Sequence, residues 1–270
     1  FDLYVINYFC QEYKQGRTPN PCIACNQYIK FAFLLHKALS LGVDHLATGH
    51  YARIEKAGDG YHLLKAADLD KDQSYFLYTL NQEKLKHLLF PLGSSTKAEI
   101  EQIVERENLP IAKPSQDICF ISQKNYRHFL RQHFLAVPGD IVDTQGRILG
   151  RHQGMAYYTI GQRHGLRLAL GKPFYVLRIE PENNRIVLGE RKELYSQKAA
   201  VKRLSWVSGK PPPEPINISA KIRYKSRRQQ LRCSQKEIPL ISVLQSHNGQ
   251  SPRARPSSST KAMRCLAAAP

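Results

Sequence analysis

Apolar residues in the first part of the chain recur at helical spacing and then give way to a strand-like run. The helical stripe, which ends before Gly42, consists of Leu34, Leu35, Ala38 and Leu39. The following segment HLATGHYARI (45–54) predicts a strand that leads into a loop. A helix followed by a strand and a polar loop indicates an α/β fold at the start of the chain.

Two further helices are predicted before the pattern changes. One lies near residues 81–89. The other follows Ser95, where STKAEIEQIVERENL (95–109) has a hydroxyl cap and acidic residues in its first turn, and Pro110 closes it. The opening stretch FDLYVINYFCQEYKQ also reads as the interior of a helix, so residue 1 is expected to be a break within a longer protein.

From about residue 125 the chain is predicted to be β-rich. A helix over 125–134 precedes short strands separated by Gly and Asp turns, and GKPFYVLRIEPENNRIVLGE (171–190) predicts a hairpin that turns at 182–184. A third segment opens after residue 196, in which SAKIRYKS (219–226) predicts another strand. From about residue 229 the composition predicts disorder. The expected domains are therefore 1–125, 126–195 and 196–270.

Charge and cysteine content narrow the classes of function. The 40 Lys and Arg residues outnumber the 22 Asp and Glu residues, which gives a net charge of +18. Such an excess favours a nucleic-acid partner, although a solvated basic surface would look the same. The chain has no apolar run long enough to span a membrane, and its opening residues are not expected to be a signal peptide. Six scattered cysteines in 270 residues indicate a reducing compartment. The cytoplasm is expected, or an organelle if the source is eukaryotic.

Two segments carry candidate thiols. In TPNPCIACN (18–26), the pair Cys22 and Cys25 is open to three interpretations: half of a zinc site, a redox pair, or one reactive thiol beside a neighbour. In SQDICFIS (115–122), a lone Cys119 between Ile118 and Phe120 is typical of a buried, inert residue. A partnership of Cys119 with Cys25 would instead make both thiols reactive.

Three other segments carry candidate binding residues. Gly49 permits close approach of a ligand to the backbone, and His50 can donate to a phosphate or a base; a turn glycine beside a solvated histidine is the alternative. Lys71, Asp72 and Gln73 can contact phosphate and base edges, or simply begin a helix. The basic run KIRYKSRR (221–228) could contact RNA, and a solvated edge strand without such a role is the alternative.

Six motifs in one order are together far more specific than any of them alone. GRTPNPCIACN, ATGHYAR, KDQSYFL, SQDICFI, YTIGQRHGL and IRYKS follow one another between residues 16 and 226. In this the chain resembles the tRNA-specific 2-thiouridylases over about residues 1–228. The resemblance implies the remnant of a parallel-sheet ATP-pyrophosphatase domain, then a small β-rich domain, then a C-terminal β-barrel that is incomplete after about residue 228.

The resemblance also implies the chemistry. ATP, with Mg²⁺, activates the C2 oxygen of the wobble uridine, and a persulfide on Cys119, loaded by a sulfur-carrier or cysteine-desulfurase system, supplies the sulfur. Cys25 then attacks the persulfide, releases sulfide and closes a transient Cys25–Cys119 disulfide, which a reductant resets. Such thiols need partial exposure and a depressed pKa. No structural metal is expected, and the anticodon arm of tRNA is the expected partner.

The remaining site residues are carried over position by position. Gly49 falls on an ATP-contacting position. Asn20, Pro21 and Cys22 fall where the family contacts the target base, and Cys22 replaces an aspartate found in some relatives, so no carboxylate can act as a base there. The residues on positions that contact tRNA elsewhere are His50, Lys71, Asp72, Gln73, Arg223 and Tyr224.

The sequence departs from the family's pattern in two places. It has no SGGVDS-type loop to cradle ATP phosphates, so this chain alone is not expected to thiolate tRNA. Its tail reads as a frame-shifted sequence, with the slip between residues 227 and 243, and residues 1–228 carry +13 of the net charge. Two alternatives stay open: another ATP-pyrophosphatase that thiolates or amidates a different substrate, and an RNA-binding module whose CxxC holds zinc.

Overall fold

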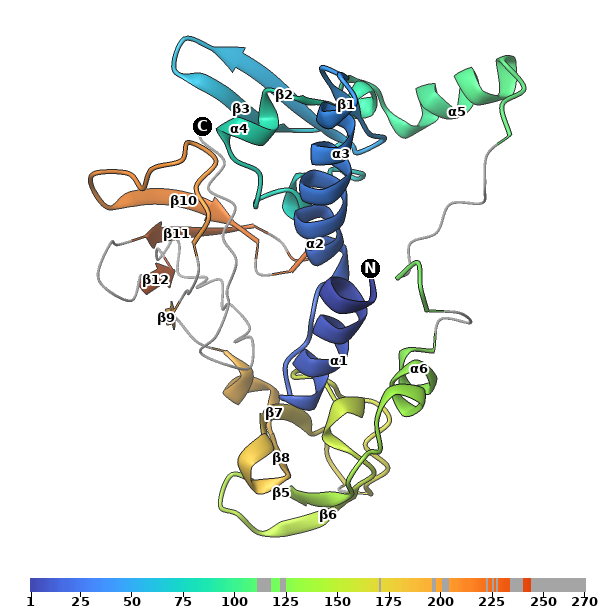
Figure 1. Cartoon of the computed structure of the whole chain (residues 1–270). Helices are drawn as coiled ribbons and strands as arrows, with labels where there is room; N and C mark the ends of the chain where they lie inside the picture. The colour runs from blue at the N-terminus through green and yellow to red at the C-terminus, as the bar shows by residue number, and fades with distance from the viewer. Residues whose placement is uncertain are drawn as a thin grey trace.

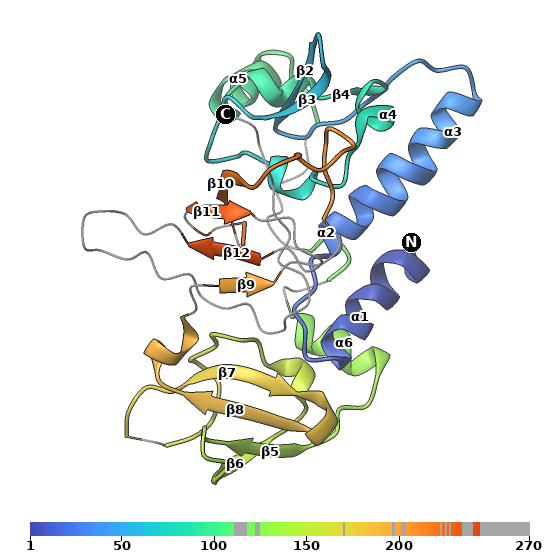
Figure 2. The same cartoon turned by 90° about the vertical axis from the view of Figure 1, so that its left-hand side faces the viewer.

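The structure is a computed structural model that describes residues 1–110, 118–121, 125–169, 171–195, 198–200, 204–221, 223–224, 226, 228–233 and 240–243. An α/β part comes first and β-rich parts follow, as predicted (Figure 1). The β2–β3 hairpin and the β5–β8 sheet lie at opposite ends of the molecule, and the third sheet lies between them in both views (Figures 1 and 2).

Helices dominate the first 40 residues. A one-turn segment over Asp2–Ile6 continues into α1 (Asn7–Lys14), and α2 (Pro21–Ala24), a wider-turned stretch over Cys25–Leu34 and α3 (Leu35–Ser40) form one continuous helix. Gly42, with a φ of +79°, follows its end, as predicted. Of the predicted stripe, Leu35 is buried, whereas Leu34 is exposed. The later helices are α4 (Gln82–Leu85), α5 (Lys97–Arg106) and α6 (Tyr126–His133).

As predicted, a strand near residue 46 leads into a loop at Gly49 and His50, and a second strand follows that loop. β1 (Leu46–Ala47) pairs in parallel with β4 (Leu88–Leu89), while β2 (Ala52–Ala57) pairs with β3 (Gly60–Lys65) in an antiparallel hairpin. The break falls at His50, whose carbonyl accepts a hydrogen bond from the N–H of Ala52 (3.0 Å) in a tight turn. The loop between the strands is thereby held beside the core that contains Phe31, Leu77 and Leu88.

The middle part is a four-stranded sheet in the order β6-β5-β8-β7. Its strands are β5 (Gly139–Val142), β6 (Ile148–His152), β7 (Tyr175–Glu180) and β8 (Arg185–Gly189). The predicted hairpin is confirmed: a short turn at Pro181–Asn183 joins β7 to β8, with Asn184 in the left-handed conformation. The core of this part also includes Phe9 and Tyr13 of α1, and the Tyr13 ring stacks on Tyr126 at 5.4 Å.

Short single turns connect these elements. They lie at Ser74–Phe76, Pro91–Ser94, Met155–Tyr157 and Arg191–Leu194. Among the described residues, no helix is both long and apolar enough to cross a membrane.

The third sheet has the order β10-β11-β12-β9, and its described strands do not close into a barrel. They are β9 (Lys198–Ala200), β10 (Ile216–Ala220), β11 (Gln229–Cys233) and β12 (Leu240–Val243). Of the strand predicted over 219–226, Ser219 and Ala220 are the end of β10. The prediction was wrong for Arg223 and Ser226, because the N–H of Ser226 donates to the carbonyl of Arg223 (3.0 Å) as in a turn. Residues 222 and 225 lie outside the described residues. Disorder from residue 229 was wrong for β11 and β12. In β11 the buried residues Leu231 and Cys233 alternate with exposed ones, and the strand pairs with both β10 and β12. Residues 244–270, most of the predicted disordered tail, lie outside the described residues.

Candidate functional site

The loop before the CxxC pair sets the start of the long helix. The Oδ1 of Asn20 accepts a hydrogen bond from the N–H of Ile23 (3.4 Å), and Pro21 occupies the first helical position, where its missing N–H is not needed. Ile23 is buried, whereas Cys22 is exposed and Cys25 is half-buried. The local sequence therefore caps the helix and leaves both thiols accessible.

Cys119 lies on a short turn held by its apolar neighbours. The N–H of Ile121 donates to the carbonyl of Ile118 (3.0 Å), and the ring of Phe120 contacts Phe9 at 5.5 Å and Phe1 at 5.8 Å. Because these neighbours pack into the core, the thiol between them is exposed rather than buried. The alternative of a buried cysteine at this position was therefore wrong.

The three thiols lie close enough for their charges to interact. Although part of the Cys22 side chain is exposed, loss of hydration around its sulfur raises the pKa, and the neighbouring charges of Cys119 and Cys25 raise it further. Burial also raises the pKa of Cys25, which Lys30 lowers and Cys119 raises. The resemblance implied depressed pKa values for Cys25 and Cys119, and this expectation was wrong for Cys25, because Lys30 only partly offsets the loss of hydration.

Two residues of this site were not anticipated from the sequence. Asn26 is 2% exposed, and its Nδ2 donates to the carbonyl of Phe76 (3.2 Å), which ties the CxxC helix to the turn after Gln73. Lys30 acts on both helix thiols and on His50. The signal for Asn26 was present: a polar residue three positions after the buried Ile23 falls on the buried face of the helix.

The segment Lys71–Gln73 forms hydrogen bonds within its own loop. The Asp72 carboxylate, 4% exposed, accepts from the N–H groups of Ala66 and Ser74 (3.2 Å each) and from the Ser74 hydroxyl (2.9 Å). Gln73 and Tyr51 exchange two hydrogen bonds of 2.7 and 3.0 Å. Asp72 and Gln73 thus shape the loop and join it to the turn after His50, while Lys71 is exposed.

Arg223 and Tyr224 connect three parts of the chain. An Nη of Arg223 donates to the carbonyl of Ile160 (3.3 Å) in the middle part. The Tyr224 ring packs on Phe76 at 4.7 Å, and Lys221 lies over it at 5.8 Å. Phe76 therefore links the CxxC helix to Tyr224, because its carbonyl accepts a hydrogen bond from Asn26 and its ring contacts the Tyr224 ring.

His50 is a buried side chain rather than a solvated one. It is 8% exposed between the rings of Phe31 (5.6 Å) and Phe90 (5.7 Å), and its Nδ1 lies 2.8 Å from the Thr48 hydroxyl. Burial first, and then the charge of Lys30, lowers its pKa to about 4. The ring is neutral at pH 7. The neighbouring Gly49 is exposed, with Leu92 3.5 Å from the position of an added Cβ, so its backbone is open to a ligand.

We expect the stability of the fold to fall as the pH drops from 6.5 towards 4. In this interval the unfolded histidine binds a proton and folded His50 does not, because its pKa is about 4. The difference between the pKa of the unfolded histidine and that of folded His50 corresponds to a loss of about 3 kcal/mol in the free energy of unfolding. Urea unfolding at a series of pH values measures the loss. His50→Gln should remove most of this pH dependence, and His128→Gln, at an exposed position, should leave it unchanged. An unchanged pH profile in His50→Gln would contradict the assignment.

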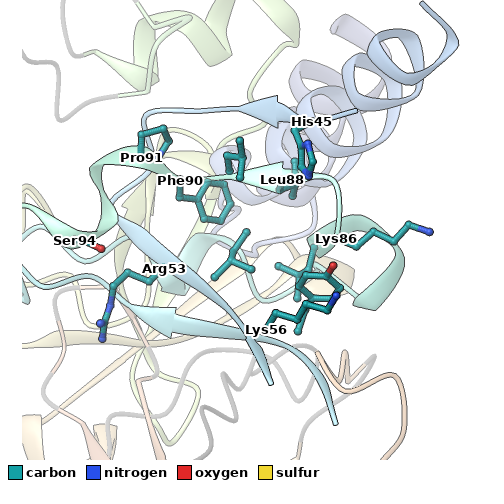
Figure 3. Close-up of a pocket in the computed structure, with 12 residues that line it drawn as sticks. His45, Arg53, Lys56, Lys86, Leu88, Phe90, Pro91 and Ser94 are labelled. Atoms are coloured by element: carbon teal, nitrogen blue, oxygen red, sulfur yellow. The ribbon is translucent and has the colours of Figure 1, made fainter. Parts of the chain in front are cut away.

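A cavity of about 410 Å³ lies between β4 and the β2–β3 hairpin (Figure 3). Its lining has no acidic residue and four basic ones, His45, Arg53, Lys56 and Lys86. None of the residues expected to act in sulfur transfer lines it, so the cavity is separate from the thiols. Among the described residues, no group of three His, Cys, Asp or Glu side chains is placed to hold a metal ion.

Comparison with known proteins identifies related chains. The model of the tRNA methyl transferase HUP domain matches residues 1–123, and that of the tRNA methyl transferase PRC-barrel domain matches residues 127–190. The tRNA-specific 2-thiouridylase MnmA of Carboxydothermus hydrogenoformans is 50% identical over 85% of this chain and 64% of its own length. The proteins of the same name from Halothermothrix orenii and Syntrophomonas wolfei are 48% and 46% identical, over 84% and 88% of this chain. The chain spans 64% and 72% of those two relatives.

Proposed function

Because the chain belongs to the tRNA-specific 2-thiouridylase family, we propose that it transfers persulfide sulfur to C2 of the wobble uridine of tRNA. The observation that carries the proposal is the neighbourhood of three accessible or half-buried thiols, two on a capped helix and one on a turn some 90 positions later in the chain. The descriptions of the domain models name methyl transfer, which needs no such set of thiols.

In the proposed reaction Cys119 carries the persulfide and Cys25 resolves it. The exposed turn presents Cys119 to a sulfur-carrier or cysteine-desulfurase system in a reducing compartment. The Cys25 thiolate then attacks Cys119 Sγ, the S–S bond of the persulfide breaks, and hydrosulfide leaves. Lys30 favours the thiolate of Cys25 against the cost of burial. The sulfide is released beside the position where Asn20, Pro21 and Cys22 would contact the target base.

ATP, with Mg²⁺, would supply the activation of the uridine C2 oxygen as a leaving group. Gly49 is the described residue that would line the nucleotide site, since its backbone is exposed. The loops of His50 and of Lys71–Gln73, joined through Tyr51, would form the tRNA surface with Arg223 and Tyr224. His50, Asp72 and Gln73 would act there mainly by holding the loop, because their side chains are buried or already hydrogen-bonded.

The sulfur step can be tested apart from activation of the uridine. A cysteine desulfurase with ³⁵S-cysteine should label Cys119 with persulfide sulfur, which alkylation and peptide mass spectrometry would locate. Label that appears on another cysteine, or not at all, would contradict the assignment. If the protein methylates tRNA from a methyl donor and takes up no sulfur, the proposal is wrong as a whole.

Binding of tRNA should weaken steeply with salt. Residues 1–228 carry a net +13, and neutralised phosphates release their counterions. With six phosphate contacts the affinity falls by about a factor of 10³ between 50 and 200 mM salt. Fluorescence anisotropy with a labelled anticodon stem-loop measures the slope. If the affinity stayed constant over this range, the positive charge would be solvated surface that does not contact RNA.

A further inference from the structure

The site holds a third thiol, Cys22, that the proposed transfer of sulfur between Cys119 and Cys25 does not use. Cys22 is the exposed member of the helix pair and Cys25 the half-buried one. The N–H of Cys25 donates to the carbonyls of both Cys22 and Pro21, so the two cysteines lie one turn apart at the beginning of the helix. Side chains three positions apart in a helix are neighbours, with about 5–6 Å between their Cβ atoms.

Cys22 also lies within reach of the bond that sulfur release would create. The charge of Cys119 acts on Cys22 and on Cys25, so all three thiols lie in one neighbourhood. Contacts of Phe120 with Phe1 and Phe9 hold that turn against the N-terminal helix. A Cys25–Cys119 disulfide would therefore form in the neighbourhood of a third thiol, Cys22.

We propose that Cys22 regenerates Cys119 by thiol–disulfide exchange, an inference that rests on the proposed function. The Cys22 thiolate attacks Cys25 Sγ of the Cys25–Cys119 disulfide. The Cys22–Cys25 bond forms, the Cys25–Cys119 bond breaks, and Cys119 leaves as a thiolate that can be loaded again. This exchange changes no net oxidation state. A cellular dithiol reductant then supplies two electrons and two protons at the exposed Cys22 and leaves as its own disulfide.

The position of the pair suits this sequence of steps. A disulfide needs Cβ atoms about 3.5–4.5 Å apart, so the first turn must tighten by about 1–2 Å. Residue Cys22 lies in that first turn, one position after Pro21, where few helical hydrogen bonds oppose the change. The exchange also moves the oxidised bond from the half-buried Cys25 to the exposed Cys22, where a reductant can reach it.

The test follows the disulfides after one sulfur release. The 270-residue chain is loaded with inorganic polysulfide without air, desalted, and sampled over time for sulfide and for disulfides, with free thiols alkylated before peptide mass spectrometry. We expect sulfide release, a Cys22–Cys25 disulfide and a free Cys119. In Cys22→Ser the Cys22–Cys25 disulfide is lost, and the Cys25–Cys119 disulfide should accumulate and persist until dithiol is added.

Each result decides between the two proposals. If sulfide is released and the wild-type chain ends with a Cys25–Cys119 disulfide and an alkylated Cys22, the exchange proposal is overturned while the proposed sulfur step stands. If no sulfide is released, the proposed sulfur step fails and the exchange with it. Cys10→Ala is the matched control, because that thiol is buried and its pKa is set by burial and Lys14 rather than by the other thiols. It should give the wild-type pattern.

Discussion

Cys119→Ser should abolish sulfide release, and Cys25→Ser should trap the sulfur on the protein. Serine cannot hold a persulfide, so the first variant should take up no sulfur at this position. The second keeps the carrier and lacks the thiol that attacks it. We therefore expect persulfide on Cys119 that persists, with a release about 100-fold slower, in line with the loss of the attacking nucleophile. Methylene-blue assay of sulfide and mass spectrometry of the Cys119 peptide measure both quantities.

Both variants should still bind tRNA as the parent chain does. A change of sulfur to oxygen alters one atom at an exposed and a half-buried position, and the capped helix and the turn are held by other residues. The Cys10→Ala chain serves as the control for the loss of any thiol. Release of sulfide at the parent rate in Cys25→Ser would show that another group resolves the persulfide, and release in Cys119→Ser would remove Cys119 from the reaction.

Gly93→Ala should destabilise the fold by about 3–5 kcal/mol. Gly93 is buried, and an added Cβ would overlap the carbonyl oxygen of Ala52 and lie 2.6 Å from its carbon. Ala52 is fully buried at the beginning of β2 and cannot yield as a flexible side chain would. The backbone must move where β2 leaves the His50 turn, so the loop that Gln73 joins should loosen as well. Urea unfolding followed by circular dichroism gives the change.

Gly58→Ala is the matched control for this substitution. Gly58 lies in the turn of the β2–β3 hairpin, where an added Cβ meets nothing within 4 Å and the backbone is outside the left-handed region. Its stability should change by no more than about 0.5 kcal/mol. If Gly93→Ala were as mild as this control, the close packing of its turn on Ala52 would not exist in solution.

The amino-acid sequence alone determined features that depend on a few neighbouring residues. The capping box of α5 joins Thr96 and Glu99, three positions apart, and Asn184 ends the predicted hairpin turn in a left-handed conformation. The motifs also identified the family, because their order and spacing are properties of the chain and not of its folding. The α/β beginning and the β-rich middle followed from the periodicity of apolar residues in the same way.

The tertiary structure decided which of those residues are buried and which meet. Asn26 and Phe76 lie 50 positions apart, and Tyr224, which lies between β10 and β11, packs on the same Phe76. No local pattern could indicate either contact. His50 became a neutral core residue because two phenylalanine rings close around it. Cys119 is exposed because Ile118, Phe120 and Ile121 pack into the core that contains Phe9 and Leu130. Burial is the sum of distant contacts, and only the folded chain brings those contacts together.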